Sequence, residues 1–229
     1  MSILENFYTT ERNGMNMSDG GGPFGFDIHF ALEVDYLINA AGCDAFIETG
    51  TNTGDTTDYM SKQYPNLSII STEIEPTFYS LASVRLKDRS NVKLHLNSSE
   101  QIMKQYRSQF KCPLYYLDAH WNEYWPLADE IRNIERGVVC VSDFFIGEEA
   151  RRGDVFYGFD SYNGVTCDKS MILRNTNPDT PIYVNNASNL DVYEYPIHQK
   201  GRRTGRAYFC KGISTDFFSN SPYFKKISY

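Results

Sequence analysis

An acid and three turn-forming residues follow a short apolar run at intervals of two positions: Glu48, Gly50, Asn52 and Gly54. Glycine lets the backbone turn sharply and approach a ligand closely, because it has no Cβ. In open α/β sheets, ligands bind where such turns leave the carboxyl ends of the strands. The segment therefore predicts a nucleotide-like ligand held at a strand-to-helix turn.

The spacing of these residues distinguishes two classes of nucleotide site. A nicotinamide dinucleotide site needs glycine at the first, third and sixth places of the turn, which here are Gly50, Asn52 and Asp55. Two of the three are not glycine, so an NAD(P)-dependent oxidoreductase is the weaker alternative. A binding module without catalytic activity is a third hypothesis.

The pattern resembles the first motif of class I S-adenosylmethionine-dependent methyltransferases, with Asn52 in the place of the usual middle glycine. Asparagine adopts left-handed backbone geometry more readily than most residues, so the turn can still form. The resemblance implies S-adenosylmethionine as the cofactor. The cofactor contacts that it implies in this segment are Glu48, Gly50, Thr51, Asn52, Gly54 and Thr56.

Polar residues also follow the second and third predicted strands. Glu73 ends the second strand, where a carboxylate can accept hydrogen bonds from the hydroxyls of a ribose, and Ile74 comes next to it. Asn97 and Ser98 follow the third strand, where the resemblance implies contact with the edge of the adenine. Ser98 also suits the N-cap of the following helix, and both roles can coexist.

The fourth predicted strand is followed by Asp118 and His120, and the fifth by Ser142 and Asp143. The order of the five motifs, over residues 45–162, resembles the macrocin-type sugar O-methyltransferases. In that branch, acids at positions 118, 142 and 143 hold a magnesium ion, and the residue at position 120 removes the hydroxyl proton. The resemblance thus implies Asp118 and Asp143 as Mg²⁺ ligands, although Ser142 leaves fewer oxygen ligands than the branch has.

His120 is the candidate catalytic base, with Asp118 as the second catalytic residue and a further expected contact of the cofactor. An alcohol is a poor nucleophile until its proton leaves, and a positioned base accelerates such a step by about 10²–10⁴-fold. Imidazole, with an ordinary pKa of about 6.5, suits this role. The alternative is a histidine that only hydrogen-bonds to a backbone carbonyl. The position of His120 just beyond a strand-end acid favours the catalytic role over this alternative.

Aromatic residues near the predicted rim of the sheet fit a carbohydrate or a phenolic acceptor, although most aromatic residues in any domain belong to its core. We expect acceptor contacts from Trp121, Tyr124, Asp143, Tyr157 and Tyr162. The resemblance implies a hydroxyl of a sugar, in a glycan or glycosylated metabolite, as the acceptor. Rings stack on sugars and on phenols alike, so a phenolic small molecule is the alternative. The basic residues within 200–206 fit either an anionic group of the acceptor or a solvated turn.

Composition limits the partners and the compartment. The 229 residues carry a formal charge of −7 with a pI near 5.1, so no positive field gathers nucleic acid or a membrane surface. The five cysteines show no paired spacing, which predicts reduced thiols. No apolar stretch is long enough to span a bilayer and no leader pattern begins the chain. We therefore expect a cytoplasmic protein whose partner is a sugar or another small hydroxylated molecule.

Short apolar runs alternate with helical patterns, which is typical of a parallel sheet with helices on both faces. We predict an α/β fold: a Rossmann-like, doubly wound, mostly parallel sheet with an antiparallel edge, in three layers. A flexible or lid-like segment at residues 1–27 precedes a single domain at 28–229. The predicted strands cover residues 45–48, 68–72, 92–96, 114–117, 138–141, 182–184, 192–195 and 206–211. The predicted helices cover residues 28–41, 56–64, 76–86, 99–110 and 127–136.

Overall fold

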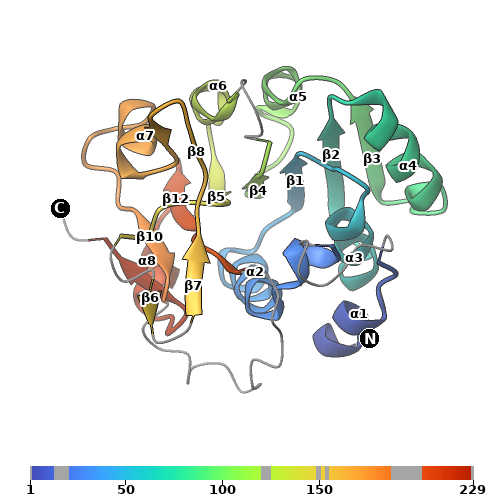
Figure 1. The fold of residues 1–229 in the computed structure, drawn as a ribbon, viewed down its shortest axis with the longest axis horizontal. Helices are drawn as coiled ribbons and strands as arrows, with labels where there is room; N and C mark the ends of the chain where they lie inside the picture. Colours follow the sequence, from blue (N-terminus) through green and yellow to red (C-terminus); the bar gives the residue numbers. More distant parts are fainter. Residues whose placement is uncertain are drawn as a thin grey trace.

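In the computed structural model, the described residues are 2–12, 21–119, 125–147, 151–152, 155–186 and 203–227. An eight-stranded mixed sheet runs through them in the order β13-β10-β12-β5-β4-β1-β2-β3 (Figure 1). The five strands from β3 to β5 in this order are parallel, whereas β12 is antiparallel to both β5 and β10. The strands are β1 Ala45–Thr49, β2 Ser68–Glu73, β3 Val92–Leu96, β4 Pro113–Leu117, β5 Gly137–Val141, β10 Tyr183–Asn185, β12 Ala207–Lys211 and β13 Phe224–Lys226.

Helices cover both faces of the sheet and complete three layers (Figure 1). Helices α5, α6 and α7 pack on one face, and α1, α2 and α3 pack on the other. The predicted Rossmann-like, mostly parallel architecture with an antiparallel edge is confirmed. The helices are α1 Ile3–Thr9, η2 Pro23–Phe26, α2 Ile28–Ala41, α3 Asp55–Gln63, α4 Pro76–Leu86, α5 Ser99–Tyr106, α6 Leu127–Asn133, α7 Lys169–Arg174 and α8 Asp216–Ser219.

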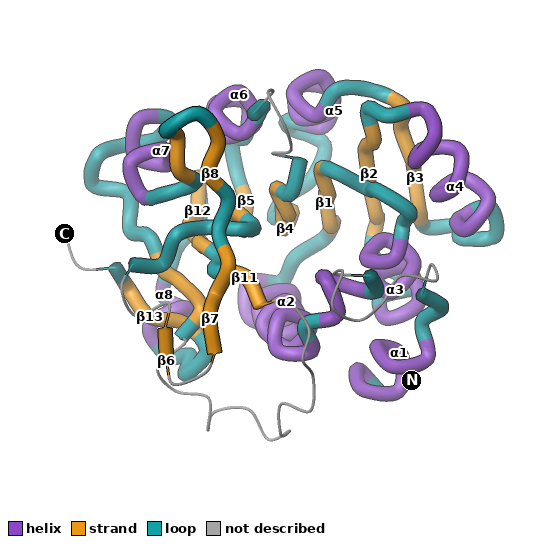
Figure 2. Tube along the Cα trace, viewed as in Figure 1, coloured by secondary structure: helices purple, strands orange, loops and turns teal. Residues whose placement is uncertain are grey.

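Short strands form two small additional sheets beside the main one (Figure 2). In one, β7 lies between β6 and β11; in the other, β8 and β9 form an antiparallel hairpin. Their bounds are β6 Arg151–Arg152, β7 Val155–Gly158, β8 Ser161–Tyr162, β9 Val165–Thr166 and β11 Arg203–Thr204. A backbone hydrogen bond from Asp160 to Asp143 holds this hairpin at the carboxyl end of β5, the edge where the predicted site lies.

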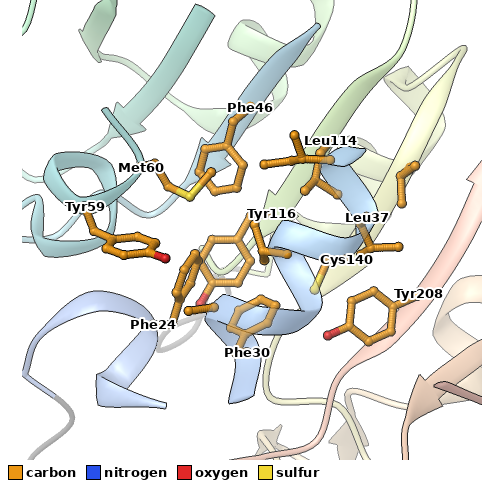
Figure 3. Close-up of a cluster of buried hydrophobic side chains, with 14 of the residues drawn as sticks. Phe24, Phe30, Leu37, Phe46, Tyr59, Met60, Leu114, Tyr116, Cys140 and Tyr208 are labelled. Carbon is orange, nitrogen blue, oxygen red and sulfur yellow. The ribbon is translucent and has the colours of Figure 1, made fainter. Parts of the chain in front are cut away.

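Alternate residues of β1 divide between two hydrophobic clusters, because successive side chains of a strand point to opposite faces. Phe46 belongs to the cluster beneath α1, α2 and α3, and Ile47 belongs to the cluster beneath α5, α6 and α7. Figure 3 shows the first cluster, where the rings of Phe46 and Tyr116 stack with their centroids 6.2 Å apart. Fixing both faces of β1 places its carboxyl end, and thus the glycine turn, rigidly.

Local signals set the bounds of α2. Asp27 is its N-cap and accepts a hydrogen bond from the backbone N–H of His29 at 3.1 Å. Gly42 ends the helix in the left-handed conformation, with φ of 65°. Glycine is favoured there because a Cβ strains that conformation. These two signals give the helix the predicted bounds of 28–41.

Two predicted helices end early. α5 stops at Tyr106 and α6 stops at Asn133, whereas the apolar periodicity predicted ends at 110 and 136. Residue Ile134 adopts an extended backbone and leads into β5, so the strand takes over from the helix. The other predicted elements that lie in the described residues differ by one or two residues at most. The predicted strand at 192–195 lies outside the described residues.

The N-terminal region contains two helices that the sequence analysis did not predict, α1 and η2. Phe7, Phe24 and Phe26 are buried, and the rings of Phe7 and Phe26 stack 5.1 Å apart. The helical pattern of apolar residues is only a few positions long there and lies among polar residues, so the sequence did not predict these helices. Residues 2–12 and 21–27 thus add to the layer beneath the sheet, while the lid-like role and the single-domain division stay predictions.

The basic residues within 200–206 were expected at the surface, either binding an anionic group or in a solvated turn. For Arg206 that expectation is wrong. Arg206 is 2% exposed, and its guanidinium lies 2.6 Å from Asp27 and 3.6 Å from Glu33. Tyr208 donates a 2.5 Å hydrogen bond to the same Glu33 carboxylate, and Arg206 also stacks on Phe30. Sequence alone could not pair position 206 with positions 27 and 33, which a long stretch of chain separates.

Candidate active site

The predicted turn leaves the carboxyl end of β1 with three residues in left-handed geometry. The φ angles are 82° at Gly50, 51° at Asn52 and 81° at Gly54. The prediction that Asn52 substitutes for glycine in this conformation is confirmed. The backbone N–H groups of Gly50 and Thr51 both donate to the carbonyl of Thr72, at 3.0 and 3.1 Å. The turn is therefore tied to the neighbouring strand β2.

Gly50 also brings the turn against the end of β4. A Cβ at this position would lie 2.7 Å from the carbonyl oxygen of Asp118 and 3.3 Å from the Cα of Ala119. Atoms do not approach a Cβ so closely, so the contact requires glycine. The turn and the residues after β4 thus form one compact backbone surface at the carboxyl edge of the sheet, where such folds bind ligands.

Glu48 braces the turn from behind. Its side chain is 1% exposed and accepts hydrogen bonds from Thr57 and, at 2.6 Å, from Ser71. The hydroxyl of Ser71 lies 2.6 Å from that of Thr51, so the network reaches into the turn itself. Burial raises the pKa of Glu48 to about 7, although both hydroxyls act against this rise. Its direct contact with a cofactor stays a proposal.

Glu73 clamps the far side of the turn at the end of β2. One carboxylate oxygen accepts from the backbone N–H groups of Ile74 and Glu75, both at 2.9 Å, and the other accepts from Asn52 at 2.7 Å. A carboxylate has about four acceptor positions, so roughly one of them is left for a further donor. The expected bond to a ribose can therefore form to one hydroxyl without breaking this clamp.

The remaining predicted cofactor contacts lie in different settings. The Ile74 side chain is 57% exposed at the end of β2, and Asn97 is exposed at the end of β3. Ser98 is the N-cap of α5, although its side chain makes no capping hydrogen bond. Thr56 accepts a 2.9 Å hydrogen bond from the backbone N–H of Phe24 and so ties α3 to η2. The structure thus gathers most of these residues at one edge and turns Thr56 toward η2.

Asp118 and Asp143 come together at the ends of β4 and β5. Tyr116 donates a 2.9 Å hydrogen bond to Asp118. Burial raises the pKa of Asp118 well above its ordinary value, and the negative charge of Asp143 raises it further. Asp143 has a φ of 49°, in the left-handed region that few residue types other than glycine, asparagine and aspartate adopt. The pair of acids therefore sits beside the turn, as the motif order predicted.

The acceptor side of the site is described only in part. His120, Trp121 and Tyr124, as well as the side chain of Tyr157, lie outside the described residues. Tyr162 lies on β8, partly buried. The backbone N–H of Asp160 donates to the carbonyl of Asp143 at 2.8 Å, which holds the β8–β9 hairpin against the end of β5. Tyr162 and Asp143 thus share the region predicted for the acceptor.

Sequence reasoning missed one buried acid near the turn. Glu130 on α6 is 1% exposed, and neither carboxylate oxygen has a hydrogen-bond partner of ordinary geometry within the described part of the chain. Burial raises its pKa to about 7, which the nearby hydroxyls of Ser99 and Thr49 partly offset and the charge of Glu100 reinforces. An acid in a helix usually lies on a solvated face, so no sequence signal marked it.

Replacing Glu130 with glutamine is expected to flatten the pH dependence of stability. The folded protein keeps a proton on Glu130 up to about pH 7. The unfolded chain releases that proton near an ordinary pKa of about 4.3. Stability is therefore lost as the pH rises through this window. When the pH rises from 5 to 8, the free energy of unfolding should fall by about 2–3 kcal/mol less in Glu130→Gln than in the wild type.

Urea unfolding curves at the two pH values measure this difference. The exposed acid Glu5 supplies the control, because Glu5→Gln should follow the wild type. A Glu130→Gln profile that is parallel to the wild-type profile would show that Glu130 does not hold its proton in the folded protein.

Two classes of binding feature are absent where the structure is described. Across the described ranges, no helix is long and apolar enough to cross a membrane. The same residues include no group of three or more His, Cys, Asp or Glu side chains placed to hold a metal ion. The implied Mg²⁺ site therefore has only Asp118 and Asp143 as charged ligands among these residues, and this donor set gives the ion little support.

Comparisons with known proteins support the fold. No protein-family model and no curated protein sequence matches the chain. Among solved structures, a putative caffeoyl-CoA O-methyltransferase from Staphylococcus aureus is similar, with a TM-score of 0.51 and 14% identity over 80% of this chain and 83% of that one. A putative sarcosine dimethylglycine methyltransferase from Galdieria sulphuraria gives 0.50 and 11% over 81% and 88%.

Spermidine synthase from Thermotoga maritima is also similar, with a TM-score of 0.50 and 12% identity over 86% of this chain and 65% of that chain. The three likenesses show that the chain shares the Rossmann-like fold of these three enzymes. They do not select a reaction, because one fold hosts several activities. The sheet also departs from the parallel six-stranded order of dinucleotide-binding proteins, since antiparallel β12 lies between β5 and β10.

Proposed function

We propose that the protein transfers a methyl group from S-adenosylmethionine to a hydroxyl oxygen of a small acceptor, a sugar in a glycan or glycosylated metabolite. The observation that carries the proposal is the left-handed turn from Gly50 to Gly54, clamped by Glu73 and pressed against the end of β4. The turn's spacing and the antiparallel strand β12 together argue against a nicotinamide dinucleotide.

The residues at the carboxyl edge fit an adenosine-containing ligand. Because Gly50 has no Cβ, the turn can lie against the carbonyl of Asp118 at the end of β4. Glu73 keeps an acceptor position for a ribose hydroxyl. Ile74 offers exposed apolar surface beside that carboxylate, which suits one face of a flat base. Asn97 and Ser98 supply polar groups next to it. Each of these contacts is part of the proposal.

The chain's own residues would orient the acceptor and remove its proton. When bound, S-adenosylmethionine supplies an electrophilic methyl group. His120 would accept the proton of the acceptor hydroxyl, so that the oxygen attacks as its negative charge develops. Asp118 would orient the base, while Asp143 and Tyr162 would hold the acceptor. Trp121, Tyr124 and Tyr157 are the further acceptor contacts that the sequence favours.

A phenolic acceptor is the second candidate. The likeness in fold to a putative caffeoyl-CoA O-methyltransferase supports it, as does the ability of aromatic side chains to stack on phenol rings. The formal charge of −7 argues against a nucleic acid as the acceptor. A cytoplasmic location agrees with reduced cysteines and is part of the same proposal.

Turnover on a panel of acceptors tests the proposed reaction. We expect mass spectrometry to detect the mass gain of one methyl group on a sugar or a phenol. His120→Ala should lower kcat by about 10²–10⁴-fold, because the hydroxyl loses its base. The variant should bind S-adenosylhomocysteine as tightly as the wild type, since the turn is untouched. Unchanged turnover in His120→Ala would remove the base from the proposal.

The proposed reaction needs no metal ion. Asp118 and Asp143 are the charged ligands that the resemblance offers, and no third joins them in the described segments. We therefore expect excess EDTA to leave the methyl gain within about twofold of the untreated enzyme. Added Mg²⁺ is the matched control and should have no effect. Loss of turnover in EDTA that Mg²⁺ restores would show that the two acids hold the ion after all.

A further inference from the structure

Three of the five cysteines gather at the edge of the sheet opposite the proposed active site. Cys43 precedes β1 and Cys112 precedes β4, so both lie where the parallel strands begin. Cys210 lies near the end of β12, which runs in the opposite direction and finishes at the same edge. Sequence spacing gave no sign of this grouping, because the three positions come from distant parts of the chain.

Cys112 lies beside Asp44, the residue that follows Cys43, so the two cysteines are neighbours just before β4 and β1. The backbone N–H of Asp44 donates to the carbonyl of Cys112 at 3.2 Å, and the N–H of Cys112 donates to the Asp44 carboxylate at 2.9 Å. Both thiols also donate to carbonyls at the end of α2: Cys43 to Leu37 at 3.7 Å and Cys112 to Ala41 at 3.5 Å. They therefore lie on the same face of the sheet, beneath one helix end.

Cys210 stands beside this pair without being part of it. Its position on β12 lies beside Val138 of β5, and Val138 in turn lies beside Leu114 of β4. One strand therefore separates Cys210 from the strand that follows Cys112. Cys140 and Cys167 are fully buried elsewhere, whereas the three gathered cysteines are all partly exposed.

We propose that Cys43 and Cys112 form an oxidisable dithiol, which a peroxide converts into a disulfide that joins the end of α2 to the start of β4. The Cys112 thiolate attacks hydrogen peroxide, which gives a sulfenic acid and hydroxide. The Cys43 sulfur then attacks the sulfenic sulfur and expels a second hydroxide, while the proton of Cys43 and that of Cys112 neutralise the two hydroxides. Overall, two thiols and one peroxide give one disulfide and two waters.

The surroundings of the two thiols assign the order of attack. Burial raises the pKa of Cys43 far above its ordinary value, and the neighbouring Cys112, Asp44 and Cys210 raise it further. Burial also raises the pKa of Cys112, but the neighbouring Cys43 side chain and the charge of Arg136 act against this rise. Cys112 thus forms the thiolate more readily, and the reaction should accelerate as the pH rises from 7 to 9.

Peptide mapping of the peroxide-treated protein tests the proposal. Lysine and arginine positions place the five cysteines in five different tryptic peptides. Under non-reducing conditions, the peptides that contain Cys43 and Cys112 should appear as one species, two hydrogens lighter than their sum. A reducing agent should separate them. Linkage of Cys112 to Cys210, or only sulfinic and sulfonic acids at Cys112, would overturn the proposal.

Variants and stability complete the test. Cys43→Ser and Cys112→Ser should each abolish the cross-link, and either one suffices if the other does not fold. Cys210→Ser is the matched control and should keep it. Because the disulfide would close a long loop, oxidation should raise Tm by about 5–10 °C in the wild type and in Cys210→Ser alone. An unchanged Tm in a protein that is fully cross-linked would contradict the joining of α2 to β4.

Discussion

Replacing Gly50 with alanine is expected to lower the affinity for S-adenosylhomocysteine at least about 100-fold. The new Cβ would lie 2.7 Å from the carbonyl oxygen of Asp118 and 3.1 Å from its carbonyl carbon. These are backbone atoms and cannot rotate away, so the turn must separate from the end of β4. The backbone surface on which the ligand is proposed to lie would then be lost.

Gly42→Ala is the matched control for this substitution. Gly42 has a similar left-handed φ of 65°, but a Cβ there would have no heavy atom within 4 Å. Both alanine variants should lose about 1–2 kcal/mol of stability to the backbone conformation. Only Gly50→Ala should lose the ligand, which isothermal titration calorimetry measures. Equal affinity in the two variants would show that the turn is not the binding surface.

Replacing Arg206 with methionine is expected to lower the free energy of unfolding by about 3–5 kcal/mol. Arg206 and its partners Asp27 and Glu33 are all buried. Methionine fills much of the same volume but leaves two carboxylates in the interior without their cation. The cost therefore comes from the partners that remain rather than from the lost arginine, and urea unfolding measures it.

Two comparisons separate this mechanism from a general loss of packing. Arg132 is 55% exposed and paired with Asp129, so Arg132→Met should cost less than about 1 kcal/mol. Adding Asp27→Asn and Glu33→Gln to Arg206→Met removes the stranded charges and should recover part of the lost stability. If the triple variant is less stable than Arg206→Met, uncompensated charge is not the cause of the destabilisation.

The sheet and its helices could be predicted from sequence because their signals are local. The alternation of Phe46 and Ile47 between two faces marks β1, and Asp27 and Gly42 mark the two ends of α2. The left-handed turn could be predicted for the same reason, because glycine and asparagine adopt left-handed backbone geometry more readily than most residues. The fold class and the left-handed turn therefore follow from short stretches of the chain.

Features that depend on distant contacts could not be predicted. Position 206 looked basic and exposed, yet Arg206 lies buried against Asp27, far away in the chain. From its sequence setting, Glu130 would be an ordinary acid on the surface of a helix, but the packing of α6 against α5 buries it. The spacing of Cys43 and Cys112 gave no sign that they are neighbours, which the hydrogen bonds between Asp44 and Cys112 make them. Such pairings depend on which strands become neighbours.

The two edges of the sheet carry different proposals and can be tested separately. The glycine turn and Glu73 lie at the carboxyl ends of β1 and β2. Cys43 and Cys112 lie where β1 and β4 begin. Oxidation of the dithiol should therefore leave the affinity for S-adenosylhomocysteine unchanged. The disulfide and the proposed methyl transfer can thus fail independently.

Calorimetric titration of the wild-type protein with S-adenosylhomocysteine tests the central claim most directly. The account predicts saturable binding of one molecule per chain, and no comparable heat with NAD⁺ or NADP⁺ under the same conditions. Binding of a nicotinamide dinucleotide in its place, or no binding of S-adenosylhomocysteine by folded protein, would contradict the assignment of the turn from Glu48 to Gly54.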